Sequence, residues 1–119
     1  MLTPNEIAGF IVNALDSKKA QDIKLLRTRE ITILADYFVI CSANSTVHLK
    51  SLSDEVEKIL KENGETPIRR EGVRSGGWVL IDFGCVVVHL FMKEAREFYM
   101  LERLWSDAED VDIKGILKT

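Results

Sequence analysis

The feature that most constrains the fold of this chain is the segment from Cys85 to Phe91, which is apolar at nearly every position. A strand with one face in water alternates apolar and polar residues, whereas a strand covered on both faces does not. We therefore expect this segment to be the central strand of a sheet. It is far shorter than the roughly 20 residues that cross a bilayer, so it does not indicate a membrane span.

The residues just before this segment predict a hairpin. Trp78 to Asp82 is a second strand-like run, and Phe83-Gly84 lies between the two runs. Glycine readily takes the positive φ that a tight turn needs, so we expect a two-residue turn here. The expected cross-strand pairs are Asp82 with Cys85, Leu80 with Val87, and Trp78 with His89. The period of two then places Trp78, Leu80 and Asp82 on one face of the sheet.

Other segments carry helix and strand signals. Thr3-Pro4-Asn5-Glu6 has the pattern of a capping box with proline at the first helical position, and predicts a helix that runs to about Lys19. A second amphipathic helix follows Cys41–Thr46 and ends at Asn63-Gly64. The other expected elements are strands at Ile23–Leu26, Tyr37–Cys41 and, weakly, Ile68–Glu71, and a third helix from Glu94 to about Trp105. This order predicts an α/β fold: a single layered domain with a mixed β-sheet flanked by helices.

Composition and charge narrow the class of protein. The 119 residues are 46% hydrophobic, which is typical of one globular domain. The N-terminus lacks the pattern of a secretory signal, so an intracellular, cytoplasmic protein is expected. Cys41 and Cys85 lie in apolar runs without metal-site spacing, and are expected to be buried free thiols. Residues 1–93 hold 12 basic and 12 acidic residues, and residues 94–119 hold 4 and 7, so the acidic C-terminal segment suits a basic protein partner better than nucleic acid.

The sequence offers three possible catalytic or phosphate-binding motifs, and the positions of their residues argue against each of them. Cys85 and His89 would share a strand face but lie about 13 Å apart. Ser45, close to His48, is better explained as a helix cap, as is the glycosylation-like sequence Asn44-Ser45-Thr46. Ser75-Gly76-Gly77 lacks the spacing of a phosphate-binding loop.

Asp82 and Trp78 remain as candidates for function. Magnesium-assisted transfer of phosphoryl or nucleotidyl groups commonly needs two or more carboxylates, and the expected register sets a thiol, not a carboxylate, opposite Asp82. A structural or partner-contacting role for Asp82 is therefore favoured. Trp78 is either a core residue or, if exposed, the residue type most enriched at interface hot spots. The sequence predicts no catalytic residue, cofactor or metal site.

Several segments together resemble the ribosomal silencing factor family, RsfS, also called Iojap. The resemblance covers about residues 3–110, and we expect one domain over residues 1–110 followed by a short tail at 111–119. It rests on Ala35–Ser42, Asp54–Val56, Arg70–Gly72, Gly77–Gly84, Val86–Phe91 and Arg96–Ala108. The family usually carries aspartate where this chain has Cys85.

The resemblance implies a translation regulator that is not an enzyme. Members bind the large ribosomal subunit through its fourteenth protein, sterically prevent joining of the small subunit, and tend to be homodimers when free. The implied fold is nucleotidyltransferase-like without the catalytic motif. On this basis Trp78, Leu80 and Asp82 are expected to contact the partner, with Tyr99 and Trp105 as secondary contacts.

Two other functions stay open at this point. One is a nucleotidyltransferase-like, metal-dependent enzyme that uses Asp82 with Asp36 or Glu71. The other is an RNA-binding module that acts through Arg69, Arg70 and Arg74. It is disfavoured because the body of the chain is neutral and its C-terminal segment acidic.

Overall fold

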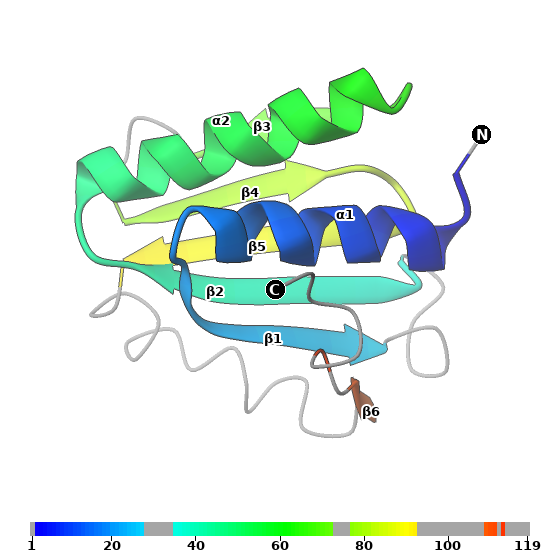
Figure 1. Ribbon diagram of the computed structural model, residues 1–119, viewed down its shortest axis with the longest axis horizontal. Coiled ribbons are helices and arrows are strands. Elements are labelled where there is room, and N and C mark those ends of the chain that lie inside the picture. Colours follow the sequence, from blue (N-terminus) through cyan, green and yellow to red (C-terminus); the bar gives the residue numbers. More distant parts are fainter. Residues whose placement is uncertain (1, 28–34, 73–76, 93–108, 112, 114–119) are drawn as a thin grey trace.

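The computed structural model describes residues 2–27, 35–72, 77–92, 109–111 and 113. Within this part of the chain, two helices lie against a six-stranded sheet (Figure 1). The helices are α1 (Pro4–Ser17) and α2 (Thr46–Glu62), and the strands are β1 (Gln21–Arg27), β2 (Tyr37–Ala43), β3 (Arg69–Glu71), β4 (Trp78–Asp82), β5 (Val86–Met92) and β6 (Glu109–Val111).

The sheet is mixed, and β5 lies inside it as the sequence predicts. The strand order is β3-β4-β5-β2-β1-β6. β5 pairs with β2 in parallel and with β4 antiparallel, and the remaining pairs are antiparallel. Because β2 and β5 are parallel, the chain must cross over between them, and α2 lies in that crossover. The predicted α/β class with a mixed sheet is confirmed.

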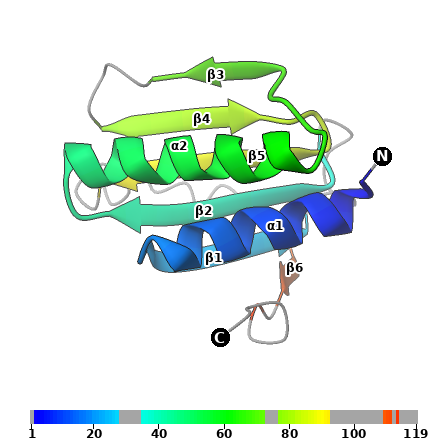
Figure 2. The same ribbon diagram turned by 45° about the horizontal axis from the view of Figure 1, so that its top comes forward.

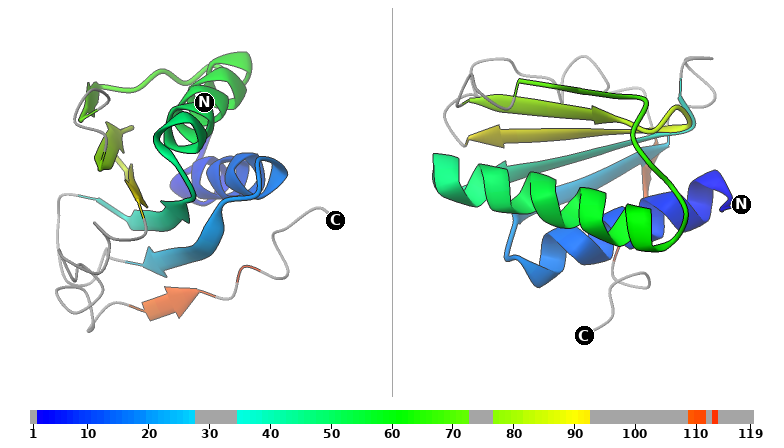
Figure 3. Two further views of the ribbon diagram at one scale, coloured as in Figure 1. Left: turned by 90° about the vertical axis from the view of Figure 1, so that its left-hand side faces the viewer. Right: turned by 90° about the horizontal axis from the view of Figure 1, so that it is seen from above.

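Both described helices pack on the same face of the sheet, which we call the helix face (Figure 3). α1 lies over β1 and β2, and α2 lies over β2 and β5 (Figure 2). The main apolar core fills the space between these layers, and its largest fully buried side chains are Ile11, Leu15, Leu25, Leu52, Leu60, Ile81 and Leu90. The opposite face of the sheet, which we call the outer face, carries a second and smaller apolar cluster.

The starts of both helices have the local chemistry that the sequence predicts. The Glu6 amide donates to Thr3 Oγ1 at 3.2 Å and the Thr3 amide donates to Glu6 Oε1 at 3.0 Å, which completes a capping box. Ser45 accepts a hydrogen bond from the His48 amide at 3.0 Å and so caps α2. These bonds satisfy amides that have no partner inside the helix.

The hairpin between β4 and β5 is present, but its predicted register is wrong by two residues. Asp82 pairs with Val87, Leu80 with His89 and Trp78 with Phe91. Phe83 is buried in the core and its amide donates to the Val86 carbonyl at 2.9 Å, so the turn residues are Gly84 and Cys85. Gly84, the first of them, has φ +90°, as a type II′ turn requires. A shift of two positions leaves each side chain on its predicted face.

Ser53 offers a direct test of the packing of α2. Its side chain is fully buried, and Oγ has no hydrogen-bond partner. Burying a hydroxyl without a partner is unfavourable, and alanine is also the better helix former. Ser53→Ala is therefore expected to raise the free energy of unfolding by about 1 kcal/mol, measured by urea titration. Ser51→Ala, on the more exposed side of the same helix, should change it by less than about half as much. A lower stability of Ser53→Ala would contradict this account.

One predicted helix lies outside the described residues, and one observed strand was not predicted. The third helix, predicted from Glu94 to about Trp105, lies outside the described part of the chain. β6 was not predicted, and it extends the sheet by pairing Val111 with Leu25. In the described part, neither helix is long and apolar enough to cross a membrane.

Candidate docking surface

The outer face brings together the predicted contact residues Trp78, Leu80 and Asp82. Cross-strand pairing sets Leu80 beside Glu71 on one side and beside His89 on the other. It likewise sets Asp82 between Arg69 and Val87, and Trp78 beside Phe91. Since paired residues point to the same face, these side chains form one surface. We call Trp78, Leu80, Asp82, Val87 and Arg69 the docking surface.

The apolar part of this surface packs on buried aromatic side chains. The Trp78 ring stacks on Phe91, with centroids 5.6 Å apart and planes 9° apart, and it stacks on His89 at 6.0 Å and 15°. Phe91 is fully buried, whereas Trp78, Leu80 and Val87 remain partly exposed. The sequence left open whether Trp78 is core or surface, and the structure makes it both: one part of the indole packs and another part is accessible.

The polar rim of the surface is an ion cluster around Arg69. Its guanidinium lies 3.8 Å from Asp82 Oδ2 and 3.7 Å from Glu71 Oε1. The other oxygen, Asp82 Oδ1, accepts a hydrogen bond from the Gly84 amide at 2.7 Å. The side chain of Asp82 is 23% exposed, against 56% for Arg69 and 59% for Glu71. Asp82 therefore has a structural role in the hairpin turn as well as a place in the rim.

His89 is the unusual group beneath this surface. Only 6% of the residue is exposed, and neither ring nitrogen has a hydrogen-bond partner. Burial lowers the pKa of His89 to about 4, because the charged imidazolium loses its hydration there. The ring is therefore neutral near pH 7. In that form it packs as an aromatic side chain between Trp78, Phe38 and Phe91.

Cys85 and Ser45, which the sequence already disfavours as nucleophiles, are not placed for catalysis in the structure either. Cys85 lies in the hairpin turn, before β5 begins, and it is only partly buried, which corrects the prediction of a buried thiol. Burial and the nearby carboxylates of Asp36 and Glu65 raise the pKa of the Cys85 thiol, so it stays protonated. Ser45 caps α2, and the ring of His48 is engaged elsewhere: its Nδ1 accepts from the Asn44 amide at 2.9 Å, and its Nε2 lies 2.8 Å from the Lys18 carbonyl oxygen.

The carboxylates proposed for a metal-dependent enzyme do not assemble into a ligand set. Arg69 lies between Asp82 and Glu71, so a cationic side chain already occupies the space between them. Asp36 precedes β2, and β5 separates that strand from Asp82. Among the residues that the structure describes, no group of three or more histidine, cysteine or acidic side chains is placed to bind a metal ion.

The arginines proposed for RNA binding point in different directions. Arg70 lies on the helix face, where it forms ion pairs with Glu57 and with Asp54 of α2, the latter at 3.3 Å. Arg69 lies in the rim of the outer face, and Arg74 is outside the described residues. Tyr99 and Trp105, the secondary contact residues, are outside them as well.

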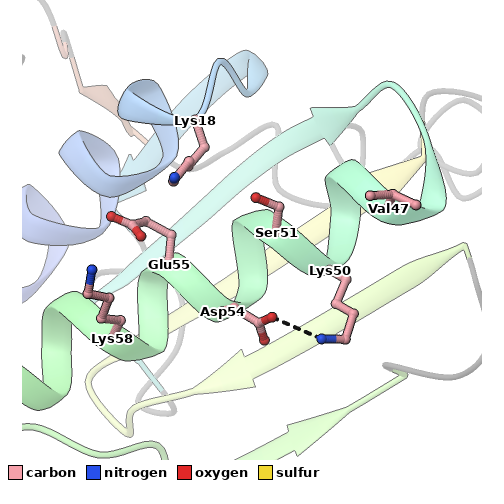
Figure 4. Close-up of a pocket in the computed structure, with 7 residues that line it drawn as sticks. All are labelled: Lys18, Val47, Lys50, Ser51, Asp54, Glu55 and Lys58. Carbon is pink, nitrogen blue, oxygen red and sulfur yellow. Dashed lines mark hydrogen bonds and ion pairs between the residues drawn. The ribbon is translucent and has the colours of Figure 1, made fainter.

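A shallow pocket lies beside α2 on the helix side of the sheet, away from the docking surface (Figure 4). Its lining is mostly charged and includes an ion pair between Lys50 and Asp54 at 3.1 Å. The lining residues are Lys18, Val47, Lys50, Ser51, Asp54, Glu55 and Lys58. Both lysines and carboxylates line the pocket, so its charge is mixed and it does not favour a ligand of one sign.

Comparison with known proteins supports one family. The sequence profile described as "Ribosomal silencing factor during starvation" (RsfS) matches residues 2–119. The chain is 40% identical to the ribosomal silencing factor RsfS of Halalkalibacterium halodurans, over 98% of this chain and 99% of that protein. It is 42% identical to RsfS of Bacillus subtilis, over 94% and 95%. A crystal structure of a Chromobacterium violaceum protein matches with a TM-score of 0.86 at 35% identity, over 88% of each chain.

Proposed function

Because the chain belongs to the ribosomal silencing factor (RsfS) family, we propose that it binds the large ribosomal subunit and prevents association with the small subunit, thereby repressing translation. The contact on the subunit is its fourteenth protein, as the family resemblance implies. In this proposal the protein forms a homodimer when free, as the family resemblance also implies. It needs no chemical step, since occupying the joining surface blocks the small subunit, and so it is not an enzyme.

The docking surface carries this proposal. Trp78 is partly exposed, yet it is held flat against the buried rings of Phe91 and His89. An anchoring side chain that is already fixed loses little conformational entropy on binding. Tryptophan is also the residue type most enriched at interface hot spots. A rigid aromatic anchor beside Leu80, with a charged rim, is the arrangement expected of a protein-docking surface.

Charge complementarity supports a basic partner. Asp82 and Glu71 lie in the rim, and residues 94–119 carry 7 acidic against 4 basic residues. Tyr99 and Trp105 belong to that C-terminal segment and extend the contact in this proposal. Complementary charge at the rim of an interface mainly raises the association rate and fixes orientation.

Trp78→Ala is expected to weaken binding to the large subunit about 30-fold, because truncation of a hot-spot tryptophan costs about 2 kcal/mol. Binding is measured by co-sedimentation of the purified protein with isolated large subunits over a range of concentrations. A second assay scores subunit joining, which the variant should no longer prevent at concentrations where the native protein does.

Two further variants make this test specific. Leu80→Ala shortens the apolar side chain beside Trp78 without adding a charge, and should also weaken binding without removing the aromatic stack. Val47→Ala removes an apolar side chain that is 78% exposed, on α2 at the helix face, and should leave binding unchanged. If Trp78→Ala and Leu80→Ala stay folded and bind like the native protein, the docking surface lies elsewhere.

A further inference from the structure

Arg69 has a position that the proposed function does not explain. It is a cation in the rim of a surface that, on this proposal, receives a basic partner, and it lies beside the two carboxylates that would attract that partner. We propose that Arg69 is an intramolecular competitor: it occupies Asp82 and Glu71 in the free protein, and so limits how tightly the docking surface binds basic groups. This inference rests on the proposed function.

The two oxygens of Asp82 are both engaged. Oδ1 accepts from the Gly84 amide at 2.7 Å, which ties it to the hairpin turn. Oδ2 is the oxygen that faces Arg69, at 3.8 Å. A guanidinium or ammonium group of a partner would therefore have to bind Asp82 at Oδ2, the oxygen that Arg69 already contacts. Glu71 is shared in the same way, since Arg69 Nε lies 3.7 Å from its Oε1.

The presence of Arg69 costs more free energy when a partner is bound than it does in the free protein. In the free state Arg69 is 56% exposed, and water completes the solvation of its guanidinium. An exposed ion pair of this kind contributes little to stability. A partner that covers Leu80 and Trp78 excludes water from the adjacent rim. Arg69 must then remain with Asp82, which keeps the partner's cation away, or lose hydration as it moves aside.

The alternation of β3 separates Arg69 from its neighbour. Arg69 lies on the outer face beside Asp82, whereas Arg70 lies on the helix face and pairs with Glu57 and Asp54. Arg70 therefore holds the edge strand to α2, and Arg69 is left to act on the docking surface. The two arginines are adjacent in sequence, yet only Arg69 is placed to compete with a partner.

The test measures binding of purified variants to isolated large subunits, at the lowest salt at which the subunits stay intact. Arg69→Gln is expected to bind about threefold more tightly than the native protein, which corresponds to the strength of a single exposed ion pair. Asp82→Asn removes the main acceptor, so adding Arg69→Gln to Asp82→Asn should give clearly less than threefold. Raising the salt concentration should reduce the gain of the single variant, since the competition is electrostatic.

Lys50→Gln is the matched control, because it removes the same charge from an exposed ion pair on the helix face. It should leave binding unchanged. Equal gains for Lys50→Gln and Arg69→Gln would mean that only net charge matters, and would overturn the proposal. Weaker binding or an unchanged affinity of Arg69→Gln would also overturn it. A native protein that does not bind large subunits contradicts the proposed function itself, which keeps the two failures distinct.

Discussion

Replacing Gly72 by alanine is expected to lower the free energy of unfolding by about 3 kcal/mol or more, among the larger effects of a single substitution. Gly72 has φ +83°, a conformation that alanine adopts only with strain. A Cβ atom at this position would also lie 2.1 Å from the Trp78 carbonyl oxygen and 3.1 Å from its carbonyl carbon. Both contacts are with backbone, so β4 must shift at Trp78.

Gly64 provides the control that separates backbone strain from steric clash. It has φ +86°, and a Cβ atom there would meet nothing within 4 Å. Gly64→Ala should therefore cost only the strain, about 1 kcal/mol. Urea titration of both variants gives the two values, and co-sedimentation with large subunits tests whether Gly72→Ala also weakens docking. Equal destabilisation of the two variants would show that the close approach of Gly72 to Trp78 does not constrain the fold.

The buried His89 is expected to make the protein less stable in acid. The pKa of His89 is about 4 in the folded state and 6.5 when the chain is unfolded. The unfolded state therefore binds more protons between these values, so stability rises with pH across this window. The contribution of His89 is complete above pH 6.5 and is lost progressively as the pH falls to about 4. The difference of about 2.5 units predicts a loss of about 3 kcal/mol over this range.

His89→Phe isolates this effect, because phenylalanine retains an aromatic ring but does not titrate. The free energy of unfolding of both proteins is measured by urea titration at a series of pH values between 7 and 4. The native protein should lose more stability than the variant, by about 3 kcal/mol. Glu6, whose pKa is lowered by its hydrogen bonds to Thr3, acts in the same direction but equally in both proteins. Parallel pH profiles of the two proteins would show that His89 is not buried neutral.

The elements that depend on neighbours in the sequence were predictable. The capping box of Thr3 and Glu6 needs only residues within one turn, and it is formed as expected. The apolar run that starts at Cys85 predicts a strand inside the sheet, and β5 takes that place, although Val87 stays partly exposed on the outer face. The period of two along Trp78–Asp82 was enough to assign Trp78, Leu80 and Asp82 to one face.

Features that depend on distant contacts were not predictable. The turn lies at Gly84 and Cys85, and not at Phe83-Gly84 as predicted, because Phe83 is buried in the core between the sheet and the helices. β6 is a strand because β1 has a free edge where Glu109–Val111 can pair, and such short segments carry little signal of their own. No local pattern indicates that Arg69, 13 residues before Asp82, lies beside its carboxylate.

The amino-acid sequence by itself determined the order of the elements from α1 to β5, the place of β5 inside the sheet and the shared face of Trp78, Leu80 and Asp82. These follow from side-chain periodicity and capping, which act over a few residues and are therefore readable without a structure. The tertiary structure decided the register of the hairpin, the partial exposure of Trp78 over Phe91 and His89, and the engagement of Asp82 by Arg69. Each of these depends on burial or on charge interactions between segments that come together only in the folded protein.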